Sequence, residues 1–344
     1  MISKIIADHI NKYPKIENQD LYKLIFQSVL AGGHLISDLK KHQEYLEKEI
    51  NDVKNYPYKE LEIIGNDLFR IYLDGIKNKI NLNTLHKLIL LTANQNKRTT
   101  KDLEDTLLKV CKYIESDSFN EFINDKRTNN YPLVSHSENY RNMYKPHYRI
   151  IHKNYAFYLN LFFKIDQLLQ TKKHVVLAID GMAGSGKSFL ANMLEEIYDA
   201  NLIKLDDFFL QDYQRTKARL NEVGGNIDYE RFTLEVLNNL AKENFSYKPY
   251  DCQTKTFKES VKLANNKLTI IEGSYSLRPE FIKYYDLKIF IKHDYKIQLK
   301  RLEKRNPKLI EKFIKEWLPK EELYHNEMID KKALDLIFDT STLY

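Results

Sequence analysis

Short apolar runs alternate with helix-like periodicities in the second half of the chain. Residues 175–179, V-V-L-A-I, form a β-branched run of the length expected for a buried parallel strand. Further strand-like runs lie at 202–205, 268–271, 287–291 and 334–338. Helical spacing after the first run is carried by Leu190, Met193, Leu194 and Ile197. This alternation predicts an α/β fold with a mainly parallel five-stranded sheet flanked by helices.

The first half of the chain has a different pattern. Lysine- and glutamate-rich stretches carry apolar residues at helical spacing, as at Leu21, Leu24 and Ile25. We therefore predict a mostly α-helical accessory domain over residues 1–165 and a second domain over residues 166–344. Residues 150–173 are expected to form the connecting helix. The pair Gly32 and Gly33 interrupts a helical pattern, which predicts a break or a close approach there.

Composition places the chain among ordinary globular proteins. Its 344 residues, 43% hydrophobic and 30% charged, are enough for a sizeable core. No run is apolar enough to cross a membrane, and the N-terminus lacks the form of a secretory signal. Two cysteines imply no disulfide framework and favour a cytoplasmic location. The formal net charge is +6 with lysines spread along the chain, which argues against nucleic-acid binding.

A phosphate-binding motif follows the first strand-like run. Residues 181–188 read G-M-A-G-S-G-K-S and match the pattern G-x-x-x-x-G-K-[ST], with a strand before the loop and a helix after it. Glycines let such a loop curl so that its N–H groups point at phosphate oxygens. Lys187 would reach the terminal phosphates, and the Ser188 hydroxyl would bind Mg²⁺. The candidate nucleotide-binding residues are Gly181, Gly184, Ser185, Gly186, Lys187 and Ser188.

Acidic residues follow two of the other strand-like runs. Asp206 and Asp207 come directly after residues 202–205, and Glu272 ends the run at 268–271. Ligands of parallel sheets bind beyond the carboxyl ends of the strands. Asp206 could therefore accept a proton from a substrate hydroxyl, with Asp207 as a possible partner in that role. A helix-capping or turn aspartate is the alternative. Glu272 could hold the water shell of Mg²⁺.

Two further groups of side chains are candidates for ligand contacts. Arg301 and Arg305 lie one helical turn apart and could fold over the phosphates, although such a pair alone is also typical of a solvated helix face. The segment 136–149 could line a pocket for an anionic or aromatic ligand, or it could be an aromatic packing seam. Its candidate residues are Tyr140, Arg141, Tyr144, His147, Tyr148 and Arg149.

Taken in order, these motifs resemble the uridine kinase-like branch of the P-loop kinases, which also holds phosphoribulokinase and pantothenate kinase. The resemblance covers about residues 172–344 and includes L-D-D-F-F, G-N-I-D-Y-E-R-F, Y-K-P-Y-D, I-I-E-G-S-Y-S-L and L-K-R-L-E-K-R-N after the phosphate-binding loop. It implies a catalytic base at Asp206, a magnesium-linked carboxylate at Glu272, and lid arginines at Arg301 and Arg305. It also implies that Asp228 binds sugar hydroxyls and that Phe209 and Tyr250 surround a nucleoside.

The chain departs from the uridine kinase pattern where the acceptor would bind. Asp207 replaces a serine, and Tyr229 with Glu230 replaces a histidine-proline pair. Residues 250–255 contain no histidine to recognise a pyrimidine. The acceptor therefore stays open between a nucleoside such as uridine and a glycerate- or pantothenate-like hydroxy compound.

Three hypotheses of different classes follow. The leading one is an ATP- and Mg²⁺-dependent kinase that moves the γ-phosphoryl group to a hydroxyl of a small metabolite. The second is a regulatory ATPase switch whose first half senses a ligand. The third is a nucleic-acid-associated P-loop protein. Only the first needs a carboxylate that activates a hydroxyl. Assembly into an oligomer is compatible with each of them.

Overall fold

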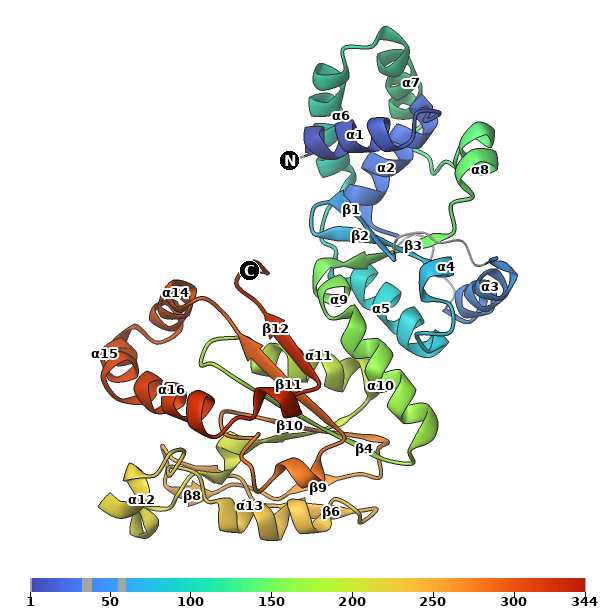
Figure 1. Cartoon of the computed structure of the whole chain (residues 1–344). Coiled ribbons are helices and arrows are strands. Elements are labelled where there is room, and N and C mark those ends of the chain that lie inside the picture. Colours follow the sequence, from blue (N-terminus) through green and yellow to red (C-terminus); the bar gives the residue numbers. More distant parts are fainter. Residues whose placement is uncertain (1, 33–38, 55–59, 344) are drawn as a thin grey trace. The chain divides into compact units, whose positions relative to one another are not determined.

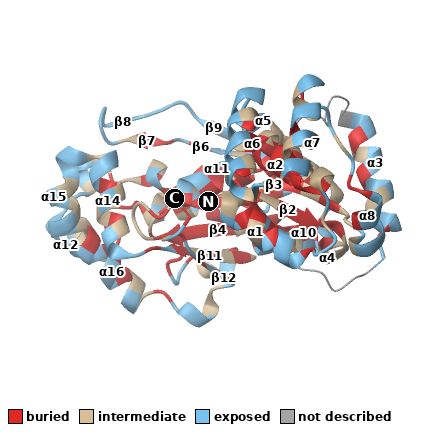
Figure 2. Cartoon of the chain, turned by 90° about the horizontal axis from the view of Figure 1, so that it is seen from above, coloured by how far each residue is buried: buried red, intermediate tan, exposed pale blue. Residues whose placement is uncertain are grey.

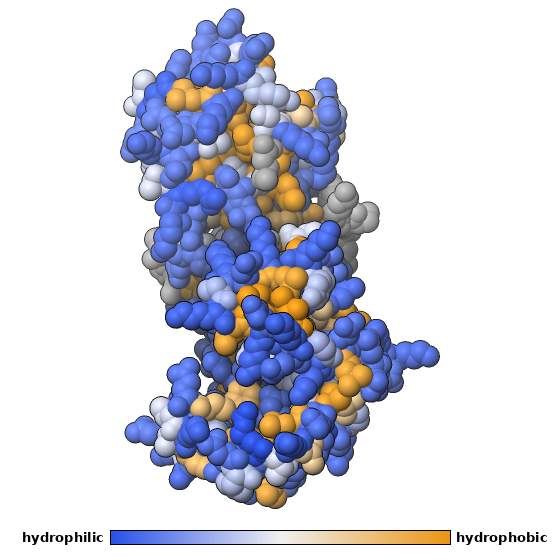
Figure 3. All heavy atoms as spheres, turned by 90° about the vertical axis from the view of Figure 1, so that its left-hand side faces the viewer, coloured by the Kyte–Doolittle hydropathy of each residue, from blue (hydrophilic) through white to orange (hydrophobic). Residues whose placement is uncertain are grey.

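The computed structural model describes residues 2–32, 39–54 and 60–343. Gly33 of the predicted helix break lies outside them. The chain divides into two compact units, Met1–Asp166 and Gln167–Tyr344, each drawn in Figure 1. Among the described helices, none has the length and apolar character needed to cross a lipid bilayer. The face of the molecule shown in Figure 3 is mostly hydrophilic, with apolar side chains visible in smaller patches.

The first unit is rich in helices and also contains a small antiparallel sheet of order β1-β2-β3. Its strands are β1 (Leu61–Gly65), β2 (Leu68–Tyr72) and β3 (Tyr148–His152). Its helices are α1 (Ile2–Lys12), α2 (Asn18–Leu30), α3 (Leu39–Asp52), α4 (Leu73–Ile76), α5 (Leu82–Gln95), α6 (Thr100–Ile114), α7 (Asp117–Thr128), α8 (Glu138–Tyr144) and α9 (Lys153–Phe157), followed by α10 (Leu159–Thr171). The helical pattern predicted this unit's helices but not its sheet.

A buried apolar cluster holds the first unit together. Helix α2 contributes Leu24 and Ile25, α6 contributes Leu103 and Leu107, and the strands contribute residues such as Ile64. These side chains are fully or almost fully buried. The helical spacing seen in the sequence of α2 is therefore the face that packs into this core.

The predicted connecting helix over residues 150–173 is wrong at its start. Ile150 and Ile151 belong to β3 and pair with Arg70 and Phe69 of β2, so the helices α9 and α10 begin only at Lys153. The isoleucines are β-branched and suit a strand once a partner strand is present. That partner lies about eighty residues earlier in the chain, beyond the reach of any local pattern.

The second unit contains a five-stranded, all-parallel sheet of order β12-β11-β4-β10-β5. The sheet strands are β4 (Val175–Gly181), β5 (Asn201–Lys204), β10 (Leu268–Glu272), β11 (Leu287–Lys292) and β12 (Leu336–Asp339). Each overlaps one of the five predicted runs, so the predicted sheet is confirmed. Strand β4 is central and every residue in it is buried, which Figure 2 shows in red.

Helices flank this sheet, and the unit also contains two small antiparallel strand pairs, β6-β9 and β7-β8. The helices are α11 (Lys187–Tyr198), α12 (Lys217–Asn221), α13 (Tyr229–Glu235), α14 (Tyr295–Arg305), α15 (Ile310–Lys312) and α16 (Leu318–Glu327). The strands of these pairs are β6 (Phe245–Tyr247), β7 (Tyr250–Asp251), β8 (Thr256–Phe257) and β9 (Val261–Leu263). Helix α11 packs on β4, β5 and β10. Phe232 of α13 shares a buried cluster with Val176 and Ala178 of β4.

The sheet topology determines where the candidate site residues meet. Strand β10 pairs with β4 on one side and with β5 on the other, and all three run in the same direction. Their carboxyl ends therefore lie next to one another at a single edge of the sheet. The phosphate-binding loop, Asp206 and Glu272 follow or end these three strands.

Candidate functional site

The phosphate-binding loop has a backbone that requires glycine. Gly181, Gly184 and Gly186 have φ values of +146°, +76° and +101°. A Cβ on Gly181 would lie 2.0 Å from the carbonyl oxygen of Ile291, which is a backbone atom of the neighbouring strand β11. Gly181 therefore allows the loop to leave the sheet in close contact with β11.

Several polar groups of this loop have no protein partner or are bonded only to the loop itself. The Lys187 ammonium donates to the carbonyl oxygens of Gly181 at 2.7 Å and Met182 at 3.2 Å. In the part of the chain that the structure describes, the N–H groups of Gly184 and Gly186 donate no hydrogen bond. The hydroxyl of Ser185 is buried and has no hydrogen-bond partner among the residues that the structure describes. Such free donors at a helix N-terminus fit a polyanion.

A cavity of about 780 Å³ opens beside the loop. This volume lies within the range of small-molecule sites. Its lining includes the following residues that the sequence had singled out: Gly184, Ser185, Gly186, Lys187, Ser188, Asp206, Phe209, Glu272, Arg301 and Arg305. The structure thus brings together most of the predicted site from four separate stretches of the chain.

Ser188 and Glu272 form a pair inside this cavity. The Ser188 hydroxyl donates to Oε1 of Glu272 at 3.0 Å, and Glu272 is buried. Burial raises the pKa of Glu272, and the positive charge of Lys187 partly offsets that rise. A hydroxyl and a carboxylate at this distance, beside a phosphate-binding loop, fit an Mg²⁺ ion that also keeps water and phosphate ligands.

The neighbouring acids Asp206 and Asp207 have different surroundings. Both lie in a single helical turn after β5, Leu205–Phe208. Asp206 is exposed and lines the cavity. Asp207 is outside the cavity lining, accepts a hydrogen bond from the Tyr247 hydroxyl at 2.9 Å, and has its pKa raised by burial. Asp206 is therefore the one of the two that a substrate in the cavity could reach.

Two residues expected to bind a nucleoside are not part of the cavity lining. Asp228 is 3% exposed and caps α13, accepting from the Arg231 N–H at 3.0 Å and from Nε2 of Gln214 at 2.8 Å. The Tyr250 ring is buried against Phe257. Each carboxylate oxygen of Asp228 thus accepts a hydrogen bond from within the protein, and Phe209 is the remaining aromatic candidate.

The two arginines of α14 also differ: Arg301 is bonded within the protein, whereas Arg305 is exposed to the cavity. Arg301 donates to the carbonyl oxygens of Gly184 at 3.3 Å and Thr340 at 2.8 Å, and so holds α14 against the phosphate-binding loop. Arg305 is exposed, lines the cavity, and makes no hydrogen bond or ion pair in the described part of the chain. Its guanidinium is available to an anion in the cavity.

Several residues of the site were missed by sequence reasoning. Glu321 of α16 accepts from the Ala183 N–H of the loop at 2.9 Å and from the Ser274 hydroxyl at 3.1 Å. Asp180 is fully buried beneath the loop and accepts from the Tyr324 hydroxyl at 2.7 Å. The position of Asp180 near the end of the apolar run that forms β4 could have marked it as a site residue, whereas no sequence pattern marked Glu321. Further cations that line the cavity are Arg215, Lys312 and Lys320.

No known protein-family profile matches the chain. Among curated proteins, uridine-cytidine kinase D of Dictyostelium discoideum is 27% identical over 127 residues, which cover 35% of this chain and 24% of that protein. The match therefore spans about a quarter of the relative's length.

Solved structures give further similarities. A possible uridine kinase from Bacillus stearothermophilus is 24% identical, with a TM-score of 0.41, and the match covers 52% of this chain and 99% of that one. Phosphoribulokinase from Rhodobacter spheroides is 13% identical, with a TM-score of 0.38 and coverage of 49% and 71%. Proteins named as uridine kinases and phosphoribulokinase are thus among those to which the chain is similar, as the motifs predicted.

Proposed function

We propose that residues 167–344 catalyse the ATP- and Mg²⁺-dependent transfer of the γ-phosphoryl group to a hydroxyl of a small metabolite. One observation carries the proposal. The phosphate-binding loop, the Ser188–Glu272 pair and the exposed carboxylate of Asp206 follow or end adjacent parallel strands and line one cavity. A switch that only hydrolyses a triphosphate has no need for a carboxylate in this position.

Each residue has a chemical task in this proposal. The free loop amides and Lys187 hold the triphosphate, and Ser188 with Glu272 holds the metal ion, which neutralises phosphate charge when bound. The acceptor hydroxyl oxygen bonds to the γ-phosphorus while the bond to the β,γ-bridging oxygen breaks. Asp206 accepts the hydroxyl proton, and Arg305 contacts the phosphoryl oxygens.

The acceptor can be a nucleoside such as uridine, with Phe209 stacking on the base. A second candidate is an anionic hydroxy compound of the glycerate or pantothenate kind. It is favoured by Arg215, which lines the cavity, is exposed, and has a side chain without a hydrogen bond or ion pair in the described residues. A carboxylate on the acceptor would give Arg215 a bidentate partner.

An ATP-consumption screen across nucleosides and small hydroxy acids tests both candidates, with Asp206→Asn and Asp207→Asn as a matched pair. We expect Asp206→Asn to keep ATP affinity and to lose transfer by about 10²- to 10⁴-fold, because the proton acceptor is gone. Asp207→Asn should transfer at nearly the normal rate. Full transfer by Asp206→Asn would remove Asp206 from the mechanism.

The screen also separates the acceptors. If an anionic acceptor is correct, Arg215→Met should raise its KM by about tenfold, the cost of one charged hydrogen bond. Neutral nucleosides should be unaffected by the same substitution. Equal ATP consumption with and without every acceptor would instead support the ATPase-switch hypothesis.

A further inference from the structure

The first unit contains a cavity of its own, with a volume of about 570 Å³. Its described lining comes mainly from α2, α3, α5, the segment before α8, and β3, and these residues belong to Met1–Asp166. The volume is in the range of sites for small organic ligands. None of these residues takes part in the proposed phosphoryl transfer.

The charged groups of this cavity favour an anion. Among the described residues that line it, Lys23, Lys41 and Arg149 are cations, and the carboxylate is Glu49, which pairs with Arg149. Lys23 forms no ion pair within the described ranges, and its ammonium donates only to the carbonyl oxygen of Val134 at 3.0 Å. Burial, helped by the charge of Arg70, lowers the pKa of Lys23 to about 8. A bound anion would supply the missing counter-charge.

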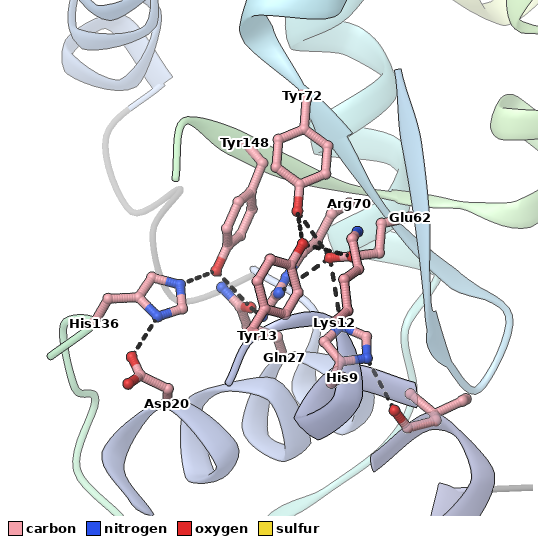
Figure 4. A network of polar contacts seen from close by, with 11 residues as sticks. His9, Lys12, Tyr13, Asp20, Gln27, Glu62, Arg70, Tyr72, His136 and Tyr148 are labelled. Carbon is pink, nitrogen blue, oxygen red and sulfur yellow. Dashed lines mark hydrogen bonds and ion pairs between the residues drawn. The ribbon is translucent and has the colours of Figure 1, made fainter. Parts of the chain in front are cut away.

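One wall of the cavity is fixed by a hydrogen-bonded chain, drawn in Figure 4. Nδ1 of His136 lies 2.7 Å from Asp20, and its Nε2 lies 2.5 Å from the hydroxyl of Tyr148. Burial would raise the pKa of Asp20, but the hydrogen bonds from His136 and Ser137 hold it below the ordinary value. Burial lowers the pKa of His136 to about 4. A neutral His136 therefore donates to Asp20 and accepts from Tyr148.

Arg70 orients Gln27, which also lines the cavity. Its side-chain oxygen accepts from Arg70 at 3.0 Å and lies 3.1 Å from the Tyr148 hydroxyl. The carboxamide NH₂ of Gln27 donates no hydrogen bond in the part of the chain described. The Tyr148 ring and Gln27 are thus held in place before any ligand arrives, which lowers the entropic cost of binding.

The remaining lining is largely apolar. Phe26, Ile89 and Ile150 contribute hydrocarbon surface, and Tyr148 adds an aromatic face. His42 lines the cavity as well and is 8% exposed, and its Nδ1 has no hydrogen-bond partner among the described residues. A ligand that suits this lining has a charged head and an apolar or planar body.

We propose that the Met1–Asp166 unit binds a small organic anion, a carboxylate or phosphate on an apolar or planar body, in the cavity between Lys23, Lys41 and Tyr148. The site is separate from the proposed kinase site, and the proposal does not depend on the kinase function.

Calorimetric titration of the full chain with phenyl phosphate, phenylacetate and benzyl alcohol tests this site. We expect at least one anion to bind at least about tenfold more tightly than the alcohol, since the alcohol lacks the charged hydrogen bonds. The tighter anion identifies the head group. The proposal would be overturned if neither anion bound at millimolar concentration, or if the anions and benzyl alcohol bound with equal affinity.

Variants assign the binding to this cavity. Lys23→Met keeps the apolar stem and removes the ammonium, and Lys41→Met does the same at an exposed position. Each should weaken anion binding by about tenfold. Lys109→Met on the exposed face of α6 is the control and should leave binding unchanged, and Lys187→Met in the phosphate-binding loop reports any anion bound in the other cavity. Loss of binding in Lys187→Met alone would place the anion in the other cavity and refute the proposal.

Discussion

Glu62 lies at the centre of the buried polar network of the first unit (Figure 4). Its carboxylate accepts from the hydroxyls of Tyr13 at 2.7 Å and Tyr72 at 2.8 Å, and it pairs with Arg70 at 3.3 Å. Arg70 is 1% exposed. Burial alone would raise the pKa of Glu62, but the His9 ring 3.4 Å away and the charge of Arg70 hold it well below the ordinary value.

Glu62→Gln should destabilise the first unit strongly. The substitution leaves the buried guanidinium of Arg70 without its counter-charge, which typically costs about 3–5 kcal/mol of unfolding free energy. Glu60→Gln is the control, because Glu60 pairs with Lys79 on the surface and such pairs contribute at most about 1 kcal/mol. Hydrogen exchange of amides in β1 and β2 measures both. If both variants lost a similarly small amount of unfolding free energy, Glu62 would not be needed for the stability of the first unit.

The same carboxylate predicts a pH dependence. Because the pKa of Glu62 is lower in the folded state than the ordinary value of 4.5, its ionisation stabilises the fold above pH 4.5. This contribution disappears as the pH falls through the folded pKa. Acid unfolding of the first unit should therefore be less steep below pH 4.5 in Glu62→Gln than in the natural sequence. If the stability of the two proteins fell equally steeply with pH, Glu62 would not be the source of this pH dependence.

Two glycines of the phosphate-binding loop should respond differently to alanine. At Gly181 the added Cβ meets the Ile291 backbone at 2.0 Å, so β4 and β11 must separate, and we expect a loss of at least about 4 kcal/mol in unfolding free energy. At Gly184 the nearest atom is 3.5 Å away, on the Leu302 side chain. Only the strain of a positive φ remains there, about 1–2 kcal/mol. Denaturant unfolding with nucleotide titration compares the two variants.

At the scale of elements, the two arginines of helix α14 differ in their contacts: Arg301 bonds to the backbone of the phosphate-binding loop, and Arg305 forms no hydrogen bond or ion pair among the described residues. Arg301→Met removes the bonds to Gly184 and Thr340 and should lower both stability and transfer rate. Arg305→Met should leave unfolding free energy within about 0.5 kcal/mol of the natural protein, as at other exposed positions. Its effect should appear in the rate of phosphoryl transfer. An Arg305→Met enzyme with an unchanged rate would exclude this side chain from the reaction.

The five strands of the second unit were predictable because each is a short apolar run buried on both faces of the sheet. The strands of the first unit were not. Strand β1 reads L-E-I-I-G, with a buried charge at Glu62 and an exposed apolar side chain at Ile63, so its pattern contradicts its burial. The buried charge depends on Arg70, a partner that becomes visible only when β1 pairs with β2.

The candidate site was predictable to the extent that it follows from strand ends. Asp206 and Glu272 come directly after or at the end of apolar runs, and both line the cavity. Side chains from loops and distant helices carried no such signal. Asp228 turned inward to cap α13, and Glu321 reached the loop from 138 residues further along the chain. These positions depend on tertiary packing rather than on local pattern.

At the scale of the whole molecule, each unit has its own buried apolar cluster. Units with separate cores generally unfold as separate cooperative steps. Mg²⁺ with a non-hydrolysable ATP analogue at a hundred times its Kd should stabilise the step assigned to Gln167–Tyr344 by about 2.7 kcal/mol. The step of Met1–Asp166 should stay unchanged in calorimetry. If the analogue stabilised only the unfolding step of Met1–Asp166, nucleotide would bind to that unit, contrary to the proposal.

The shared direction of β4, β5 and β10 leaves the opposite edge of the sheet without any residue of the proposed reaction. The segment between β9 and β10 contains Asn265, which is exposed and lies three residues before the amino end of β10. With the exposed Cys252 of the cavity lining replaced by serine, a cysteine introduced there could carry a fluorescent dye or a surface tether about one strand length from the reacting groups. Labelling at this position would let single molecules be followed through turnover without altering the chemistry under observation.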